Sequence, residues 1–225
     1  LAFVRLVDGH ATYEFYDESS AGRMLEPRDM PLLSPEVTAL YFGGISLACE
    51  PCADAYADLL AQNGRTRAVM LDPNIRPGFI RDIARYRARL DRMIAHSDIV
   101  KVSDEDLNWI TPEPLSLREK VEGLLDKGAS LVILTRGGEG ATGFMAGGEE
   151  VQVPAVKAEI ADTVGAGDTF NAGVLAKLSE LGCLHKAGLA ALAPEALGAA
   201  LTHGARVAAI TVSRAGANPP WASEL

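Results

Sequence analysis

The amino-acid sequence predicts an α/β fold in which helices cover both faces of a mainly parallel β-sheet. Short apolar runs alternate with helix-length amphipathic segments from residue 39 to residue 135, and this order favours parallel pairing because a helix supplies each crossover. A chain of 225 residues that is 48% hydrophobic can bury a core of its own. No internal repeat, low-complexity segment or linker divides the sequence, so we expect a single domain over residues 1–225.

The opening stretch, LAFVRLVDGHATYEFY, predicts a β-hairpin. Apolar residues alternate on both sides of Asp8 and Gly9, and an Asp-Gly pair between two such runs is typical of a two-residue turn. We therefore expect two paired strands ahead of the main sheet.

The segments that follow predict strands and helices in strict alternation. The expected strands are ALYFGG (39–44), RAVMLD (67–72), DIVKVS (98–103) and SLVILT (130–135). Between the second and third, residues 80–97 predict a helix with one apolar face and a solvated face of arginines in i,i+4 pairs. The apolar face is formed by Ile83, Tyr86, Leu90 and Ile94.

A second helix over residues 116–128 begins with a capping box. Ser116 and Glu119 have the spacing at which each side chain bonds the other's backbone N–H. Its apolar residues are Val121, Leu124 and Leu125.

After Thr135 the pattern changes to two glycine-separated strands, GATGFMA and EEVQVPAV. A helix is then expected from about Asp168 to Leu181, ended by Gly182. Its apolar stripe consists of Phe170, Val174, Leu178 and Leu181. An Ala-rich helix from residue 194 to residue 210 closes the pattern.

Composition argues against several classes of partner. The net charge of −9 disfavours nucleic acid, which is bound by clustered Lys and Arg. No apolar run reaches the ~18 residues of a membrane helix, and the start LAFVRLVDGH lacks the features of a secretion signal. We expect a soluble, cytoplasmic protein without a membrane partner.

The cysteines and histidines do not form a metal or redox pattern. Cys49 and Cys52 spell C-x-x-C, but no second Cys/His pair stands at ligand spacing. Together with Cys183 they are an odd number, so we expect buried, unreactive thiols rather than disulfides. The histidines have no ligand spacing either and are expected at surface or hydrogen-bonded positions. They are His10, His96, His185 and His203.

The stretch DTVGAGDTFNAG, residues 162–173, predicts an anion-binding helix terminus. A helix N-terminus offers unpaired N–H groups and partial positive charge, and Gly165, Ala166 and Gly167 would let an anion approach them closely. A carboxylate beside an anion is repulsive unless it has a chemical role. Asp168 fits a general base that takes a proton from an attacking hydroxyl. The alternative is that Asp168 only caps the helix and that the glycines only form a turn.

The same stretch closely resembles the second signature of the ribokinase-type sugar kinase family, also called the phosphofructokinase B group. It is neither a G-x-x-x-x-G-K-[ST] loop nor a dinucleotide fingerprint, because Phe170 stands where the third glycine would be. The resemblance implies a ribokinase-like α/β fold, with Asp168 as the catalytic base. It also implies that the amides of Gly165, Ala166 and Gly167 form the anion hole.

Two further segments resemble family elements near the phosphates. LDPNIRP is similar to a D-P-N-x-R strand end, which implies that Asp72, Asn74 and Arg76 lie near the phosphates. KVSDED stands where the family has N-x-x-E, with Ser103 for Asn on the ATP side and Asp106 for Glu on Mg²⁺. The shorter Asp106 is expected to reach Mg²⁺ through water.

The nucleotide side resembles the family in two places. TRGGEGA is similar to a T-x-G-x-x-G loop, although a plain glycine-rich hairpin is the alternative, and ARVAAITVSRAGA is similar to the segment that lines adenine and a monovalent cation. The ATP contacts so implied are Thr135, Gly137, Gly140, Ala205 and Ala208, and Asp162 is implied as a neighbour of K⁺.

The resemblance covers nearly the whole chain and implies ATP-dependent phosphorylation of a sugar hydroxyl, with fructose as the expected sugar. FGGISLACEP is similar to the GSISL element of the fructokinase branch, and YEFYDESSAGRML is similar to a lid strand and sugar-facing loop. Residues 1–25 are therefore expected to contribute to a β lid and to a homodimer formed through it.

The family's early acid-bearing strand and GG...N element are not in this sequence, and we expect a longer kinase. The alternatives are a 2-keto-3-deoxygluconate or nucleoside kinase, or a non-catalytic sugar or nucleotide sensor.

Overall fold

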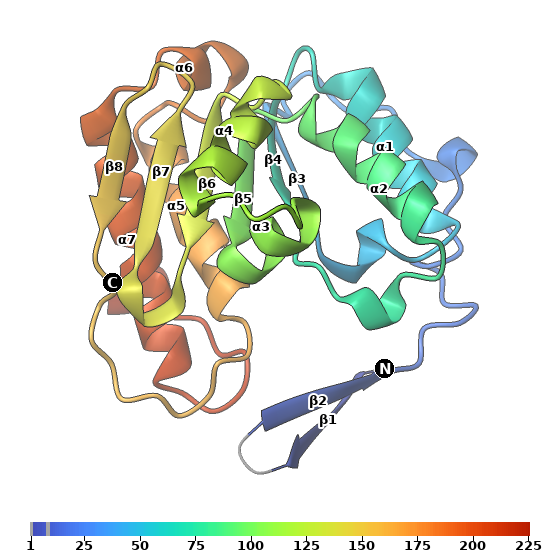
Figure 1. Cartoon of the computed structure of the whole chain (residues 1–225), viewed down its shortest axis with the longest axis horizontal. Coiled ribbons are helices and arrows are strands. Elements are labelled where there is room, and N and C mark those ends of the chain that lie inside the picture. Colours follow the sequence, from blue (N-terminus) through green and yellow to red (C-terminus); the bar gives the residue numbers. More distant parts are fainter. Residues whose placement is uncertain (1, 8–9) are drawn as a thin grey trace.

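The main body of the protein is a six-stranded sheet between two layers of helices (Figure 1). The structure is a computed structural model that describes residues 2–7 and 10–225, with side chains described at Phe3 and from Tyr16 onward. The strand order is β3-β4-β5-β6-β7-β8. The first four strands are parallel, whereas β7 and β8 run antiparallel to their neighbours. The predicted fold class is confirmed.

The strands of this sheet follow the chain order. They are β3 (Ala39–Gly43), β4 (Ala68–Asp72), β5 (Ile99–Ser103), β6 (Leu131–Thr135), β7 (Ala141–Met145) and β8 (Glu150–Val153). The helices are α1 (Cys52–Asn63), α2 (Ile83–Ile94), α3 (Asp104–Ile110), α4 (Leu117–Asp126), α5 (Ala166–Glu180), α6 (Lys186–Ala190) and α7 (Pro194–Val212).

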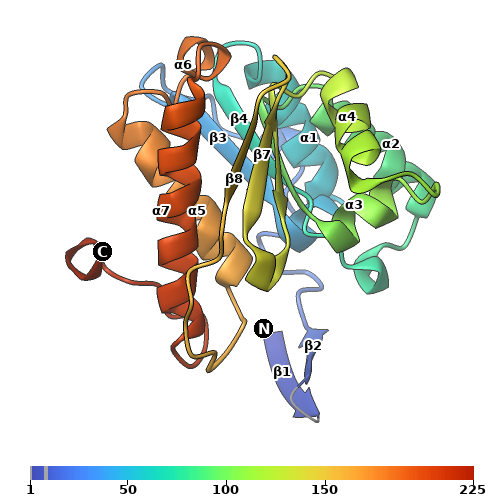
Figure 2. The ribbon, with the colours of Figure 1, turned by 60° about the vertical axis from the view of Figure 1, so that its left-hand side comes forward.

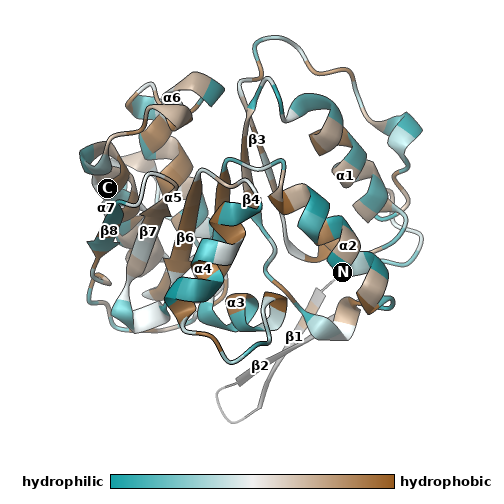
Figure 3. Cartoon of the chain, turned by 45° about the horizontal axis from the view of Figure 1, so that its top comes forward, coloured by the Kyte–Doolittle hydropathy of each residue, from teal (hydrophilic) through white to brown (hydrophobic). Residues whose placement is uncertain are grey.

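Two apolar cores lie on the two faces of the sheet (Figures 2 and 3). Successive strand residues point to opposite faces, so Val69 and Leu71 of β4 join the core under α1 to α4, whereas Met70 joins the core under α5 to α7. Gly173 and Gly204 bring α5 and α7 into close contact, because a Cβ on Gly173 would lie 2.9 Å from Cα of Gly204. The position of α5 is therefore fixed by backbone packing.

The opening hairpin forms a separate two-stranded sheet of β1 (Ala2–Val7) and β2 (His10–Phe15). In Figures 1 and 2 it lies beyond the end of the main sheet at which β3 to β6 terminate. The strands confirm the predicted hairpin, while its turn residues Asp8 and Gly9 lie outside the described residues. Phe3 packs edge-on against Tyr16 with ring centroids 5.6 Å apart.

Three expectations for the helices need correction. Helix α5 begins at Ala166 rather than near Asp168. Ile83 is 58% exposed, because it is the first residue of α2, and Leu181 is exposed just beyond α5. The arginine face of α2 is not fully solvated: Arg89 is 1% exposed and pairs with Glu50 and Asp54 at the start of α1.

The capping box of Ser116 and Glu119 is present, and Val121 and Leu124 are buried as expected. Within the described residues all cysteines are free. Burial raises the pKa of the Cys49 thiol and raises that of Cys52 to about 11, so the expectation of unreactive thiols is confirmed for this pair. In the described part of the chain, no helix is long and apolar enough to span a membrane.

Candidate active site

The four parallel strands end along one edge of the sheet in polar or glycine residues. Gly43 pairs with Asp72 at the ends of β3 and β4, and Ser103 pairs with Thr135 at the ends of β5 and β6. Ligands of open α/β sheets bind outside the carboxyl ends of the strands. The first turn of α5 reaches the same edge, as its contact with Lys101 shows.

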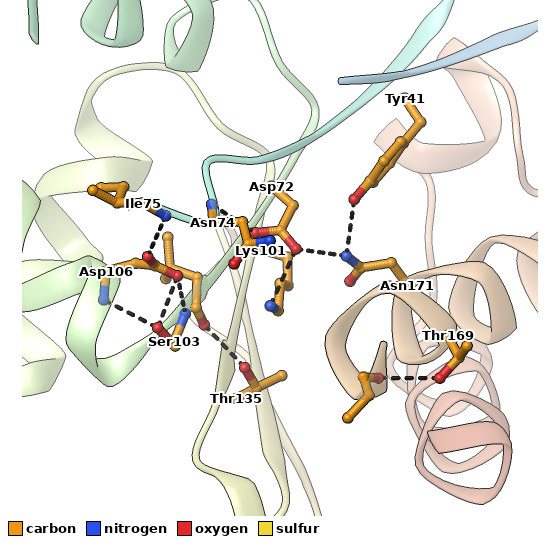
Figure 4. A network of polar contacts seen from close by, with 12 residues as sticks. Tyr41, Asp72, Asn74, Ile75, Lys101, Ser103, Asp106, Thr135, Thr169 and Asn171 are labelled. Carbon is orange, nitrogen blue, oxygen red and sulfur yellow. Dashed lines mark hydrogen bonds and ion pairs between the residues drawn. The ribbon is translucent and has the colours of Figure 1, made fainter. Parts of the chain in front are cut away.

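Asp72 is the centre of a buried polar network at this edge (Figure 4). Its Oδ2 accepts hydrogen bonds from Nζ of Lys101 at 3.1 Å and from Nδ2 of Asn171 at 2.7 Å, and its Oδ1 accepts the N–H of Asn74. Burial raises the pKa of the Asp72 carboxyl, and the charge of Lys101 and the amide of Asn171 oppose this rise. Because all of these partners belong to the protein, the Asp72 carboxylate holds β5, α5 and the loop after β4 together at this edge.

Lys101 places a buried positive charge under the first turn of α5. Its Nζ lies 3.4 Å from the point where a Cβ on Gly167 would stand, and the residue is 5% exposed. The neighbouring residue Ile99, on the same face of β5, belongs to the apolar core. Lys101 therefore departs from the apolar pattern of β5 at the point where the sheet meets the start of α5.

The first turn of α5 has the geometry of an anion site. Gly165 is the residue before the helix and has φ of +80°, a conformation that favours glycine. The N–H of Ala166 bonds O of Thr163 at 3.3 Å. Within the described residues, the N–H groups of Gly167 and Asp168 have no protein acceptor, as expected for a helix start.

Asp168 is the third residue of α5, and its side chain is exposed. The helix has no side-chain cap, so the alternative that Asp168 serves as the cap is wrong. No hydrogen bond or ion pair engages its carboxylate within the part of the chain that is described. Burial and the charge of Asp72 are the main causes of a raised pKa of the Tyr41 hydroxyl, and the charge of Asp168 adds to them. Asp168 and Tyr41 therefore interact electrostatically.

The loop after β4 presents the predicted residues Asn74 and Arg76 at the same edge. Asn74 is half-buried with φ of +42°, and Arg76 is exposed and donates to O of Ile75 at 3.0 Å. The N–H of Ile75 donates to Oδ1 of Asp106 at 2.7 Å. The loop is thus fixed by Asp72 on one side and Asp106 on the other.

Ser103 and Asp106 form the capping box of α3. Oδ2 of Asp106 accepts the N–H and the hydroxyl of Ser103, while Oγ of Ser103 accepts the N–H of Asp106 at 3.0 Å. Asp106 is buried and its Oδ2 is fully used. A direct metal bond does not fit this arrangement, whereas a contact through water from Oδ1 does. The described residues contain no cluster of three or more acids, histidines or cysteines that could hold a metal ion.

The predicted nucleotide loop follows β6, next to Ser103. Thr135 lies across from Ser103, and its hydroxyl donates weakly to O of Val102 at 3.4 Å. Gly137 has φ of +48° and is exposed with open space around it. Gly140 is buried, and a Cβ there would lie 2.1 Å from O of Val153. Of these two glycines, Gly137 is thus accessible, whereas Gly140 is needed for packing.

The remaining predicted positions lie further along the α5–α7 side. Ala205 and Ala208 on α7 are partly buried against the core of that face. Asp162 accepts the N–H groups of Val164 at 3.0 Å and Gly216 at 2.9 Å, and these bonds lower the pKa of its carboxyl. It therefore joins the chain before the GAGD turn to the segment after α7.

Sequence reasoning missed Lys101, Asn171 and Tyr41. Lys101 had a local signal, because a lysine inside the apolar strand IVKVS is unusual unless it is paired. Asn171 and Tyr41 had none, since their contact joins residues far apart in the chain and depends on how α5 meets β3.

The chain is similar to known proteins along almost its whole length. The model of the family described as pfkB family carbohydrate kinase matches residues 3–224. A fructokinase from Rhizobium leguminosarum bv. trifolii is 48% identical over 201 residues, which are 88% of this chain and 60% of that protein. This chain thus spans about three fifths of that relative's length.

Two solved structures show the same fold. A fructokinase with bound ATP from Xylella fastidiosa superposes with a TM-score of 0.82 at 22% identity, over 96% of this chain and 68% of that one. An aminoimidazole riboside kinase from Salmonella enterica, complexed with aminoimidazole riboside and an ATP analogue, has a TM-score of 0.72 at 26% identity, over 92% and 65%. With the family model matching almost the entire chain, this protein belongs to the pfkB family of carbohydrate kinases.

Proposed function

We propose that this protein transfers the γ-phosphate of ATP to a hydroxyl of a sugar, with fructose as the acceptor. The observation that carries the proposal is the exposed carboxylate of Asp168, which no described residue binds. It lies in the same helical turn as two unpaired N–H groups and above the buried Lys101. A site of this kind offers a base for the acceptor and positive potential for the phosphoryl group.

Asp168 takes the proton from the acceptor hydroxyl as its oxygen attacks phosphorus. The N–H groups of Gly167 and Asp168 and the helix dipole stabilise the charge on the transferring group, and Lys101 adds a full positive charge from beneath. Arg76, exposed at the same edge, reaches phosphate oxygens from the loop after β4. Ser103, Thr135 and Gly137 border the nucleotide.

Mg²⁺ would supply charge neutralisation on the ATP phosphates when it is bound. Asp106 is the residue of this chain that would hold it, through water, since Mg²⁺ commonly keeps several waters. A K⁺ ion near Asp162 belongs to the same proposal. The two backbone N–H groups on Asp162 keep its carboxylate charged and in place.

We propose fructose as the acceptor because the relative that is 48% identical is named a fructokinase. The turn that includes Gly44–Leu47, GISL, follows β3 at the active-site edge beside Asp72. A nucleoside or related riboside is the second candidate, since the Salmonella enterica structure contains one.

The β1–β2 hairpin is proposed as the lid and as the contact of a homodimer. An isolated two-stranded hairpin is marginally stable in water, and this one carries the exposed rings of Phe3 and Tyr16. Coverage by a second subunit would bury them. Sedimentation of wild-type protein and of Phe3→Asp tests this: a monomer in both contradicts the dimer.

An acceptor screen tests the proposed function. ADP release from ATP is followed with fructose, 2-keto-3-deoxygluconate, ribose and nucleosides, using the full-length gene product. The proposal expects the highest kcat/KM with fructose. Binding of ATP without ADP release with any acceptor would identify a sensor instead.

A further inference from the structure

Asn171 links the helix of the candidate base to two strands of the sheet. It lies three residues after Asp168 on α5, so the two side chains are neighbours along the helix. Its Nδ2 donates to Oδ2 of Asp72 at 2.7 Å and to Oη of Tyr41 at 3.2 Å. Figure 4 shows this amide between the two strand residues.

The link acts close to the start of α5, at the sixth residue of the helix. Further along the helix, Gly173 fits against Gly204 of α7, which fixes the distance between these helices. Nearer the start of the helix, Phe170 joins the apolar core on this face of the sheet, and Asn171 makes the polar contacts with β3 and β4. The Nδ2 bonds therefore set how the first turn is oriented over Asp72 and Lys101.

The amide is an unfavourable choice for packing alone. Asn171 is 1% exposed, and its Oδ1 is buried without a hydrogen-bond partner in the described part of the structure. Burial of an unpaired carbonyl oxygen destabilises a fold. A residue of this kind fits a role that needs its N–H groups in a fixed direction.

We propose that Asn171 is a positioning residue for phosphoryl transfer. Through Asp72 and Tyr41 it holds the first turn of α5, so that Asp168 and the N–H of Gly167 keep a fixed geometry over Lys101. The proposal rests on the proposed function, because it assigns the positioning of that same site.

Asn171→Ala tests it by separating kcat from KM. Loss of the link displaces the base and anion site, and kcat should fall on the order of 10²-fold, while KM for ATP stays within about threefold. Asn63→Ala is the matched control, since its Nδ2 also donates a hydrogen bond, in this case to the backbone O of Leu59 at 2.8 Å, far from the site. Unchanged kcat in Asn171→Ala would overturn the proposal.

Asn171→Asp gives a pH signature. The groups that face position 171 are Asp72 from β4, Lys101 from β5, Tyr41 from β3 and Asp168 earlier on α5. A neutral carboxyl can donate to Asp72 as the amide does, whereas a charged one repels it. The ratio of the variant's kcat to that of wild type should rise as pH falls. A ratio that is independent of pH contradicts the proposal.

Amide hydrogen exchange decides the question without turnover. Peptides that cover residues 163–170 should exchange faster in Asn171→Ala than in wild type and be unchanged in Asn63→Ala. If wild type phosphorylates no acceptor, the proposed function is wrong, but this exchange still tests the link. Equal exchange in wild type and Asn171→Ala overturns it.

Discussion

Nζ of Lys101 lies 3.1 Å from Oδ2 of Asp72, and both groups are buried beneath the first turn of α5. The pair joins β5 to β4 at the edge where the four parallel strands end. Because Lys101 also faces Gly167, its charge contributes to the fold and, in the proposed function, to the anion site.

Lys101→Met should therefore affect both stability and activity. Removal of one partner of a buried ion pair costs about 3–5 kcal/mol, and less at acid pH, where Asp72 can take a proton. In the folded fraction, kcat/KM for ATP should fall on the order of 10²-fold, as for other lost charge contacts to a transition state. Urea titration and steady-state kinetics measure the two effects.

Lys120→Met is the matched control. Lys120 is equally buried, but its Nζ donates to Oδ1 of Asn108 at 2.7 Å, away from the site. It should lower stability and leave kcat/KM unchanged. If both lysine variants keep wild-type kinetics, Lys101 has no part in phosphate binding.

Replacement of Arg89 should lower the unfolding free energy much more than replacement of Arg85, although the two arginines share their partners. Both contact Glu50 and Asp54, but Arg89 is 1% exposed and also donates to O of Leu47 at 2.9 Å. Arg89→Met should cost about 3 kcal/mol of unfolding free energy, and Arg85→Met less than about 1 kcal/mol. Chemical denaturation of both variants measures this difference, and equal losses would contradict the burial argument.

The Asp54 carboxyl should make stability fall at acid pH. Burial opposes its ionisation, but the hydrogen bond from Arg85 and the charge of Arg89 outweigh burial and lower the pKa. A lowered pKa stabilises the fold above the unfolded-state value of about 3.9, and this is lost as pH falls through the folded-state value. The unfolding free energies of wild type and Asp54→Asn should converge below about pH 4, and a constant difference would contradict it.

Two glycines of the predicted nucleotide loop should respond differently to alanine. A Cβ on Gly140 would lie 2.1 Å from O of Val153, so Gly140→Ala should cost more than about 3 kcal/mol or prevent folding. Gly137 has open space, so Gly137→Ala should cost only about 1 kcal/mol for its positive φ. Thermal unfolding of the two variants checks this difference, and a larger loss of stability in Gly137→Ala than in Gly140→Ala would contradict it.

The layered fold could be predicted because its signals are local. Apolar runs such as RAVMLD and the capping box at Ser116 depend on neighbouring residues, and both were found as expected. The GAGD turn was recognisable for the same reason. Ser103 and Asp106 carried a local signal as well, since S-x-x-D is close to a capping box.

Contacts between distant segments could not be predicted. Arg89 was expected on a solvated face because its partners lie 35 and 39 residues away, in α1 and just before it. The contact of Asn171 with Tyr41 spans 130 residues. Such pairs form only when the helices take their places on the sheet, which the residues of one segment do not determine.

The role of Asp168 is tested most directly by Asp168→Asn in the full-length protein, with fructose and ATP. Asp104→Asn is the matched control, since Asp104 is an exposed acid in the first turn of α3. If Asp168 is the base, kcat falls on the order of 10²–10⁴-fold in Asp168→Asn, ATP affinity is retained and the control is unaffected. A kcat equal to that of wild type in Asp168→Asn would contradict it.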